Sequence, residues 1–219
     1  MKHTFFIKDW LNSFLSLLFP HCCVVCGRPL AKGEECLCIM CNINLPRTNY
    51  HLWKDNPVER LFWGQIPLER ATSFFFYRKG SDFRQILHQL KYGGKKEVGI
   101  IMGRYMAAEL SDSGFFEGVD VIIPIPLHKK KQQIRGYNQS ECIARGIAAV
   151  TGITVCVESV VRRKNTETQT RKSVFERWEN VDGIFELNHA DSLTGKHILI
   201  VDDVLTTGAT TIACASRLG

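Results

Sequence analysis

The segment 197–211, which reads HILIVDDVLTTGATT, constrains the fold more than any other part of the chain. Its apolar start predicts a buried strand, which ends in two adjacent carboxylates, Asp202 and Asp203. Small and hydroxylated residues follow and lead into an apolar stretch from Thr210 that predicts a helix. A strand that passes through a short loop into a helix is the repeating unit of α/β proteins. The segment therefore places the chain in the α/β class.

Strand and helix signals alternate in the same way across residues 71–219, which we assign to one domain. Strands are predicted at 72–77, 119–125, 153–161, 184–187 and 197–201, and helices at 82–92, 97–110, 138–150 and from 210. Strands separated by helices predict a mainly parallel, doubly wound sheet. Ligands of such sheets bind beyond the carboxyl ends of the strands, so we expect the functional site there.

Six of the nine cysteines fall between residues 22 and 41. Four of them form two C-x-x-C pairs: Cys23, Cys26, Cys38 and Cys41. Such pairs can place four thiolates around one zinc, although their separation is short for a zinc ribbon and Cys22 and Cys36 are further candidate ligands. The alternative is a disulfide cluster, which the lack of a secretory signal does not support. We therefore predict a structural zinc ribbon at 21–47, followed by an irregular connector at 48–70.

The first twenty residues carry many apolar side chains and predict a short amphipathic helix at 1–20 that packs on its own protein. Attachment to a membrane surface is the alternative. No stretch approaches the roughly 18 uninterrupted apolar residues of a membrane span. Lys and Arg number 28 against 22 Asp and Glu, a net charge of +6, which suits an anionic partner such as nucleic acid or a phosphorylated small molecule.

The loop after Asp203 has the chemistry of a phosphate-binding site. Its residues are Thr206, Thr207, Gly208, Ala209 and Thr210. Hydroxyls, backbone N–H groups and the following helix terminus can bind a phosphate monoester, and a glycine lets the backbone approach it. An apolar strand ending in Asp-Asp also occurs in P-loop ATPases, but the G-x-x-x-x-G-K-[ST] pattern is absent. A solvated turn is the remaining alternative.

Two further segments suit a phosphorylated ligand. The strand at 119–125 runs into a basic turn with Leu127, His128, Lys129, Lys130 and Lys131, and Arg135 soon follows. Arg135 is the strongest candidate for pyrophosphate, because a guanidinium binds phosphate through two hydrogen bonds. The polar segment 162–180 is long for a loop in a compact domain, which favours a functional lid. A basic surface loop or a nucleic-acid contact is the alternative.

Residues 201–210 are similar to the phosphoribosyl-pyrophosphate signature of type I phosphoribosyltransferases, and the chain after Pro20 resembles the ComF family, in which a zinc ribbon precedes such a domain. The supporting segments are 23–30, 90–92, 124–127, 135–139 and 162–180. The resemblance implies that Asp202 and Asp203 hold the ribose hydroxyls and that 206–210 bind the 5′-phosphate. It assigns 127–131 with Arg135 to pyrophosphate, and in the lid it matches Thr166, Gln169, Arg177 and Asn180.

The resemblance also implies a function. We expect a cytoplasmic phosphoribosyltransferase, a pentosyl-class glycosyltransferase, that binds phosphoribosyl pyrophosphate with magnesium in a nucleic-acid-related pathway such as DNA uptake in competence. Single-stranded DNA and proteins of the competence machinery are further candidate partners. The alternative is a non-catalytic module that senses a nucleotide or binds single-stranded DNA through the ribbon and the basic loop. The family usually continues into another strand after the last helix, which the given sequence does not include.

Overall fold

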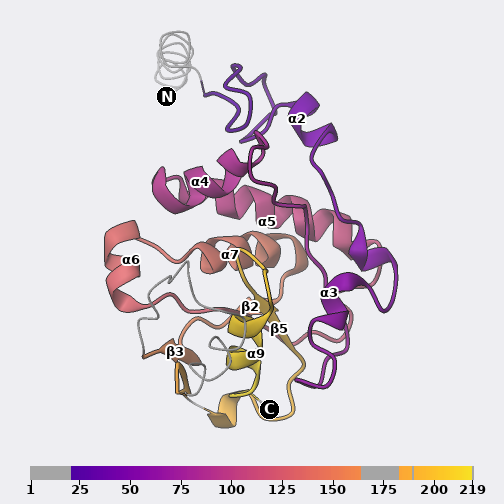
Figure 1. Ribbon diagram of the computed structural model, residues 1–219, viewed down its shortest axis with the longest axis vertical. Coiled ribbons are helices and arrows are strands. Elements are labelled where there is room, and N and C mark those ends of the chain that lie inside the picture. Colours follow the sequence, from indigo (N-terminus) through magenta and orange to yellow (C-terminus); the bar gives the residue numbers. More distant parts are fainter. Residues whose placement is uncertain (1–20, 164–182, 189, 219) are drawn as a thin grey trace, which may run out of the picture. The chain divides into compact units, whose positions relative to one another are not determined.

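The computed structural model describes residues 21–163, 183–188 and 190–218 (Figure 1). The expected amphipathic helix at 1–20 and most of the expected lid, including Gln169 and Arg177, lie outside these residues. The described residues divide into two compact units, one formed by 21–46 with 77–86 and the other by 47–76 with the residues from 87 onward. None of the helices within the described residues combines the length and apolar character needed to cross a bilayer.

The first unit contains a tight turn around the first cysteine pair and the short helix α2 (Ile39–Ile43) around the second. The loop between the pairs is fixed by the carboxylate of Glu34, which accepts hydrogen bonds from the backbone N–H groups of Ala31 and Ile39, both at 2.7 Å. Because the Ile39 N–H belongs to the first turn of α2, this carboxylate also caps the helix.

The second unit contains a three-stranded parallel sheet in the order β2-β1-β5, which confirms the predicted α/β class. Its strands are β1 (Val121–Pro124), β2 (Thr154–Val155) and β5 (Ile198–Val201). All four residues of β1 are buried, as expected for a central strand of a parallel sheet. A separate antiparallel pair is formed by β3 (Val160–Arg162) and β4 (Phe185–Leu187).

Helices contribute to the core on both faces of β1. The helices of the second unit include α5 (Lys96–Ser111), α6 (Lys129–Arg135), α7 (Gln139–Thr151) and α9 (Ala209–Ala215). Ile122 packs with residues of α5 and α7, whereas Val121 and Ile123 pack with residues of α9. Successive side chains of a strand point to opposite faces, which explains this division.

Two glycines let α5 and α7 lie in direct backbone contact, side by side in Figure 1. A Cβ added at Gly103 of α5 would overlap the carbonyl oxygen of Ile143, and one added at Gly146 of α7 would overlap that of Ile100. The contact fixes the position of α7, and its first residues reach the carboxyl ends of the strands, as described below.

Two predicted strands are wrong in their extent. The aromatic run 72–77 has the composition of a strand, but among the described residues its strand-like contacts are an isolated bridge between Phe75 and Arg47 and a hydrogen bond from the N–H of Thr48 to the carbonyl of Phe74. The strand predicted at 153–161 is divided into β2 and β3. The N–H of Cys156 still donates to the carbonyl of Ile122, after which the chain bends away and β3 pairs with β4 instead.

Two predicted irregular segments contain helices. The basic turn predicted after Leu127 is the start of α6, because His128 Nδ1 accepts from the N–H of Lys130 and Gly136 ends the helix with φ 82°. The connector predicted at 48–70 holds a 3₁₀ turn, Tyr50–Leu52, and α3 (Pro57–Arg60). α3 begins at the buried Asn56, whose side chain accepts from two of its N–H groups in a capping box. A further 3₁₀ turn, Ala190–Ser192, precedes β5.

Candidate functional site

The carboxyl ends of β1 and β5 meet the start of α7. The N–H of Ile125, just past β1, donates to the carbonyl of Val201 at the end of β5 (2.9 Å). Asn138 caps α7 through its Oδ1, which accepts from the N–H of Ser140, and its Nδ2 donates to the carbonyl of Ile125 at 3.0 Å. One buried side chain therefore ties the first turn of α7 to the strand end where the sequence predicts the site.

Asp202, the first residue after β5, lies against this helix start. Its Oδ1 accepts hydrogen bonds from the Ser140 hydroxyl at 3.2 Å and from the backbone N–H of Asp203 at 2.8 Å. Burial, and then the charge of Asp203, raise the pKa of Asp202 to about 6, and the hydrogen bonds only partly oppose this rise. A carboxyl with such a pKa keeps its proton more readily than an exposed aspartate does.

Asp203 pairs with a lysine from another element. Its Oδ2 lies 3.0 Å from Nζ of Lys91, in the last turn of α4 (Arg84–Tyr92), and both side chains are largely buried. The hydroxyl of Tyr137 donates to the carbonyl of Leu90 at 2.7 Å and ties this turn to the segment before α7. Lys91 belongs to the segment 90–92 that resembles the ComF family, but nothing in its local sequence shows which carboxylate it meets.

Arg135 reaches the same helix start through Gln139. Its guanidinium donates to Oε1 of the buried Gln139, the first residue of α7, at 2.7 Å. It also lies 5.6 Å from the ring centre of Tyr92, at the end of α4. Arg135 is therefore held between the two helix ends that contact the carboxylates. Gln139 is next in sequence to Ser140, which contacts Asp202, and Tyr92 is next to Lys91, which contacts Asp203.

The predicted phosphate loop lies between Asp203 and α9. Gly208 caps α9 with φ 77°, and a Cβ added there would lie 3.0 Å from the ring of Phe62. Phe62 is buried with Val58 and Ile212, so a segment predicted as a connector supports one side of this loop. Thr206 and Thr210 are exposed. The aromatic character of 48–70 was visible in the sequence, but its packing partner was not.

The structure thus brings three of the predicted site residues together. Asp202, Asp203 and Arg135 are joined through Ser140, Lys91, Gln139 and Tyr92. Leu127 and His128 precede α6, Lys129 begins it, and His128 already accepts a hydrogen bond as its cap. Gln169 and Arg177 lie outside the described residues.

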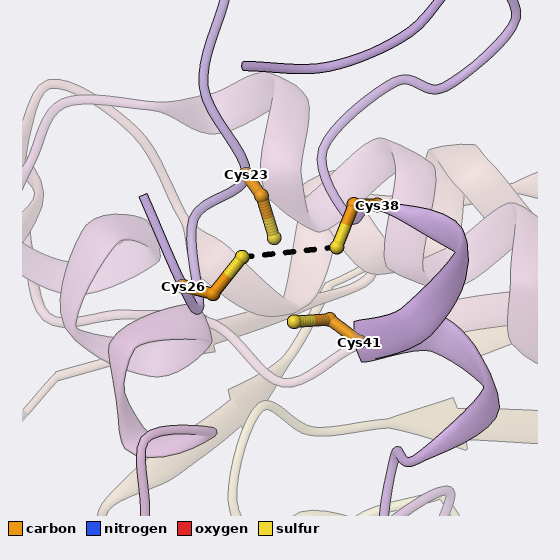
Figure 2. A group of neighbouring side chains, drawn as sticks. All are labelled: Cys23, Cys26, Cys38 and Cys41. Carbon is orange, nitrogen blue, oxygen red and sulfur yellow. Dashed lines mark hydrogen bonds between the residues drawn. The ribbon is translucent and has the colours of Figure 1, made fainter. Parts of the chain in front are cut away.

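The two cysteine pairs meet in the first unit. Figure 2 shows the sulfurs of Cys23, Cys26, Cys38 and Cys41 pointing toward one another. All four sulfurs lie within 4.8 Å of one another, and those of Cys26 and Cys38 are 3.7 Å apart. Four thiolates about 2.3 Å from a tetrahedral zinc are separated by about 3.8 Å, so this group can bind a metal such as zinc. Cys22 and Cys36 are not part of it.

The backbone arranges these sulfurs. The N–H of Cys23 donates to the carbonyl of Arg28 and that of Gly27 to the carbonyl of Cys23, which closes the first turn. Hydrogen bonding from the Arg28 backbone and side chain lowers the pKa of Cys26 to about 6, while burial raises that of Cys41. Metal binding would displace the remaining protons, because the thiolate is the ligand.

The chain is similar in sequence to proteins named for DNA utilization and for competence. The DNA utilization protein YhgH of Shigella flexneri is 29% identical over 217 residues, 92% of each chain. The competence protein ComFC of Bacillus subtilis is 26% identical over 91% of this chain and 72% of its own length. The competence protein F of Haemophilus influenzae is 34% identical over 92 residues, 42% of this chain and 40% of its own.

No family model and no solved structure matches the chain. The similarity to YhgH and ComFC nevertheless extends over more than nine-tenths of this sequence. The chain is therefore a relative of the ComF competence proteins.

Proposed function

We propose that this chain is a phosphoribosyltransferase-like protein that binds phosphoribosyl pyrophosphate with magnesium. The observation that carries the proposal is the placement of Asp202 and Asp203 at the carboxyl end of β5, against the start of α7 and the end of α4. In α/β sheets this edge is where ligands bind. The proposal includes a doubly wound fold of the type I phosphoribosyltransferases for residues 71–219 and a structural zinc ribbon at 21–47.

Each part of the ligand has a counterpart in the proposal. Asp202 and Asp203 accept hydrogen bonds from the ribose hydroxyls, and the hydroxyls and backbone N–H groups of 206–210 bind the 5′-phosphate. Arg135, with residues 127–129, binds pyrophosphate as the leaving group, and Gln169 and Arg177 belong to a lid over the site. Magnesium, held largely by ligand oxygens and water, would neutralise charge on the leaving pyrophosphate.

The names of the relatives add DNA to this proposal. YhgH is named as a DNA utilization protein and ComFC as a competence protein, so we infer a role in the uptake or use of DNA. The net charge of +6 suits such a polyanion. If the chain instead acts as a single-stranded DNA module without the sugar-phosphate ligand, its DNA affinity will fall steeply with salt concentration.

Isothermal titration with phosphoribosyl pyrophosphate and magnesium tests the proposal. Wild type should bind, and Asp202→Asn/Asp203→Asn should bind about 10- to 100-fold more weakly, because hydrogen bonds to charged groups are lost. The matched control is Asp112→Asn/Asp191→Asn, which removes two exposed carboxylates outside the site and should bind like wild type. A wild-type protein that binds no ribose phosphate would overturn the proposal.

A pyrophosphate-release assay on the ligand-bound protein distinguishes an enzyme from a nucleotide sensor. Candidate nitrogen bases added to the bound protein should release pyrophosphate if transfer occurs, since the base displaces it at the anomeric carbon. Binding without release for every base would favour the nucleotide-sensing alternative.

A further inference from the structure

We infer that Lys91 is a positioning residue, which holds the carboxylate of Asp203 in the orientation that the ribose hydroxyls require. The inference rests on the proposed function for the identity of the ligand. The observation behind it is the ion pair between Lys91, at the end of α4, and Asp203, two positions past β5.

The geometry of the pair is specific. Nζ of Lys91 lies 3.0 Å from Oδ2 of Asp203, and the side chains are only 23% and 15% exposed. Exposed ion pairs contribute little, but removal from solvent strengthens the attraction between the two charges. An ammonium on one carboxylate oxygen also restricts rotation of the side chain, so the other oxygen keeps a fixed direction.

A second contact holds the lysine in place. The Tyr137 hydroxyl donates to the carbonyl of Leu90, the residue before Lys91, at 2.7 Å. Asn138, which follows Tyr137, ties the same segment to the end of β1. The last turn of α4 is therefore tied to the segment that precedes α7, which fixes the backbone from which the Lys91 side chain extends.

Lys91 places a positive charge beside two neighbouring carboxylates. Asp203 is adjacent to Asp202, and its negative charge raises the pKa of Asp202. The other groups that face Asp202 are the Ser140 hydroxyl of α7, the Arg162 guanidinium of β3 and the Cys214 thiol of α9. The charge of Lys91 also lowers the pKa of Asp202, against the larger effect of burial. Among the described residues, Lys91 is the partner with which Asp203 forms an ion pair.

A double-mutant cycle tests whether Lys91 acts through Asp203. Phosphoribosyl pyrophosphate with magnesium is titrated into wild type, Lys91→Gln, Asp203→Asn and the double variant. Lys91→Gln should bind about tenfold more weakly and should cause no further loss in the Asp203→Asn background. Lys91→Arg should restore most of the affinity. Lys196→Gln is the matched control, because it removes one exposed lysine beside the amino end of β5.

Two results would overturn the inference: Lys91→Gln binding like wild type, or an equal loss of affinity in both backgrounds, which would mean direct contact with the ligand. A ligand-free measurement separates this failure from that of the proposed function. Carboxyl ¹³C NMR should show the pKa of Asp202 rising in Lys91→Gln, because the charge of Lys91 lowers it, and staying unchanged in Lys196→Gln. If wild type binds no ribose phosphate, the proposed function fails, and unchanged carboxyl pKa values in Lys91→Gln overturn the role of Lys91 as well.

Discussion

At the scale of single residues, the carboxylate of Asp202 at the end of β5 opposes stability. Asp202 is a largely desolvated acid beside a second acid, and its pKa of about 6 exceeds the ordinary value of 3.8. Its hydrogen bonds from Ser140 and from the Asp203 N–H do not remove this cost. A residue that destabilises the free protein is expected where a ligand, rather than the fold, requires the charge.

Asp202→Asn should therefore make the protein more stable at alkaline pH. The folded state binds the Asp202 proton more tightly than the unfolded state, so the cost of ionisation is complete above about pH 6 and absent below about pH 4. The amide oxygen can still accept both hydrogen bonds. Urea unfolding should show a gain of about 1–3 kcal/mol near pH 8 that shrinks toward pH 5. Asp191→Asn, on the surface, should give no gain, and a pH-independent effect of Asp202→Asn would contradict this account.

At the scale of elements, the placement of α7 decides where its first residues lie. α7 meets α5 through glycines at Gly103 and Gly146, where no side chain separates the backbones. The first turn of α7 carries the Asn138 cap, the hydroxyl of Ser140 and the amide of Gln139 that contacts Arg135. A shift of this helix would therefore move several groups of the candidate site at once.

Gly146→Ala tests this contact through the sign of its effect. Alanine in a helix is ordinarily favoured over glycine by about 1 kcal/mol. Here its Cβ would overlap the carbonyl oxygen of Ile100, so the helices must separate and stability should fall by about 1–3 kcal/mol. Thermal unfolding of the variant gives the answer. Arg145→Ala, next to it on the exposed side of α7, should change stability by a few tenths of a kcal/mol at most, and a stabilised Gly146→Ala would exclude close helix contact.

At the scale of the whole molecule, each of the two compact units has its own source of stability. The second unit has apolar clusters on both faces of β1. The first has few buried apolar side chains besides its cysteines and Leu37, Leu45 and Ile86, so metal binding would supply much of its folding free energy. The exposed side chains of Ile39, Met40 and Ile43 show how little of α2 the described residues cover.

Metal analysis of protein purified without added zinc should find about one zinc per chain. Cys23→Ser should lose it, and limited proteolysis should then cut within 21–46, because the turn around the first pair has lost a ligand. Cys22→Ser is a close control, since it changes the adjacent, exposed cysteine that lies outside the cluster and should keep the metal. Zinc-free wild-type protein that resists proteolysis there would exclude a structural metal.

Local sequence signals predicted much of this structure. The apolar runs at β1 and β5 and the helices near 82–92, 97–110 and 138–150 were predicted within a few residues, because burial on a strand or along one helix face leaves a periodic pattern. The C-x-x-C spacing likewise predicted which four sulfurs meet, although Cys22 and Cys36 could be set aside only from coordinates. The strand predicted at 72–77 was wrong, because the composition of a segment does not show whether a partner strand lies beside it.

The sequence by itself determined the α/β class, the two carboxylates at a strand end and the pairs of cysteines, because each depends on a pattern of residues close together in the chain. Only the tertiary structure decided that Lys91 meets Asp203, that Ser140 meets Asp202 and that Phe62 lies against Gly208. These contacts join residues from 62 to 146 positions apart, Ser140 with Asp202 being the nearest and Phe62 with Gly208 the farthest. Such pairings follow from how helices pack on a sheet, which no local pattern records.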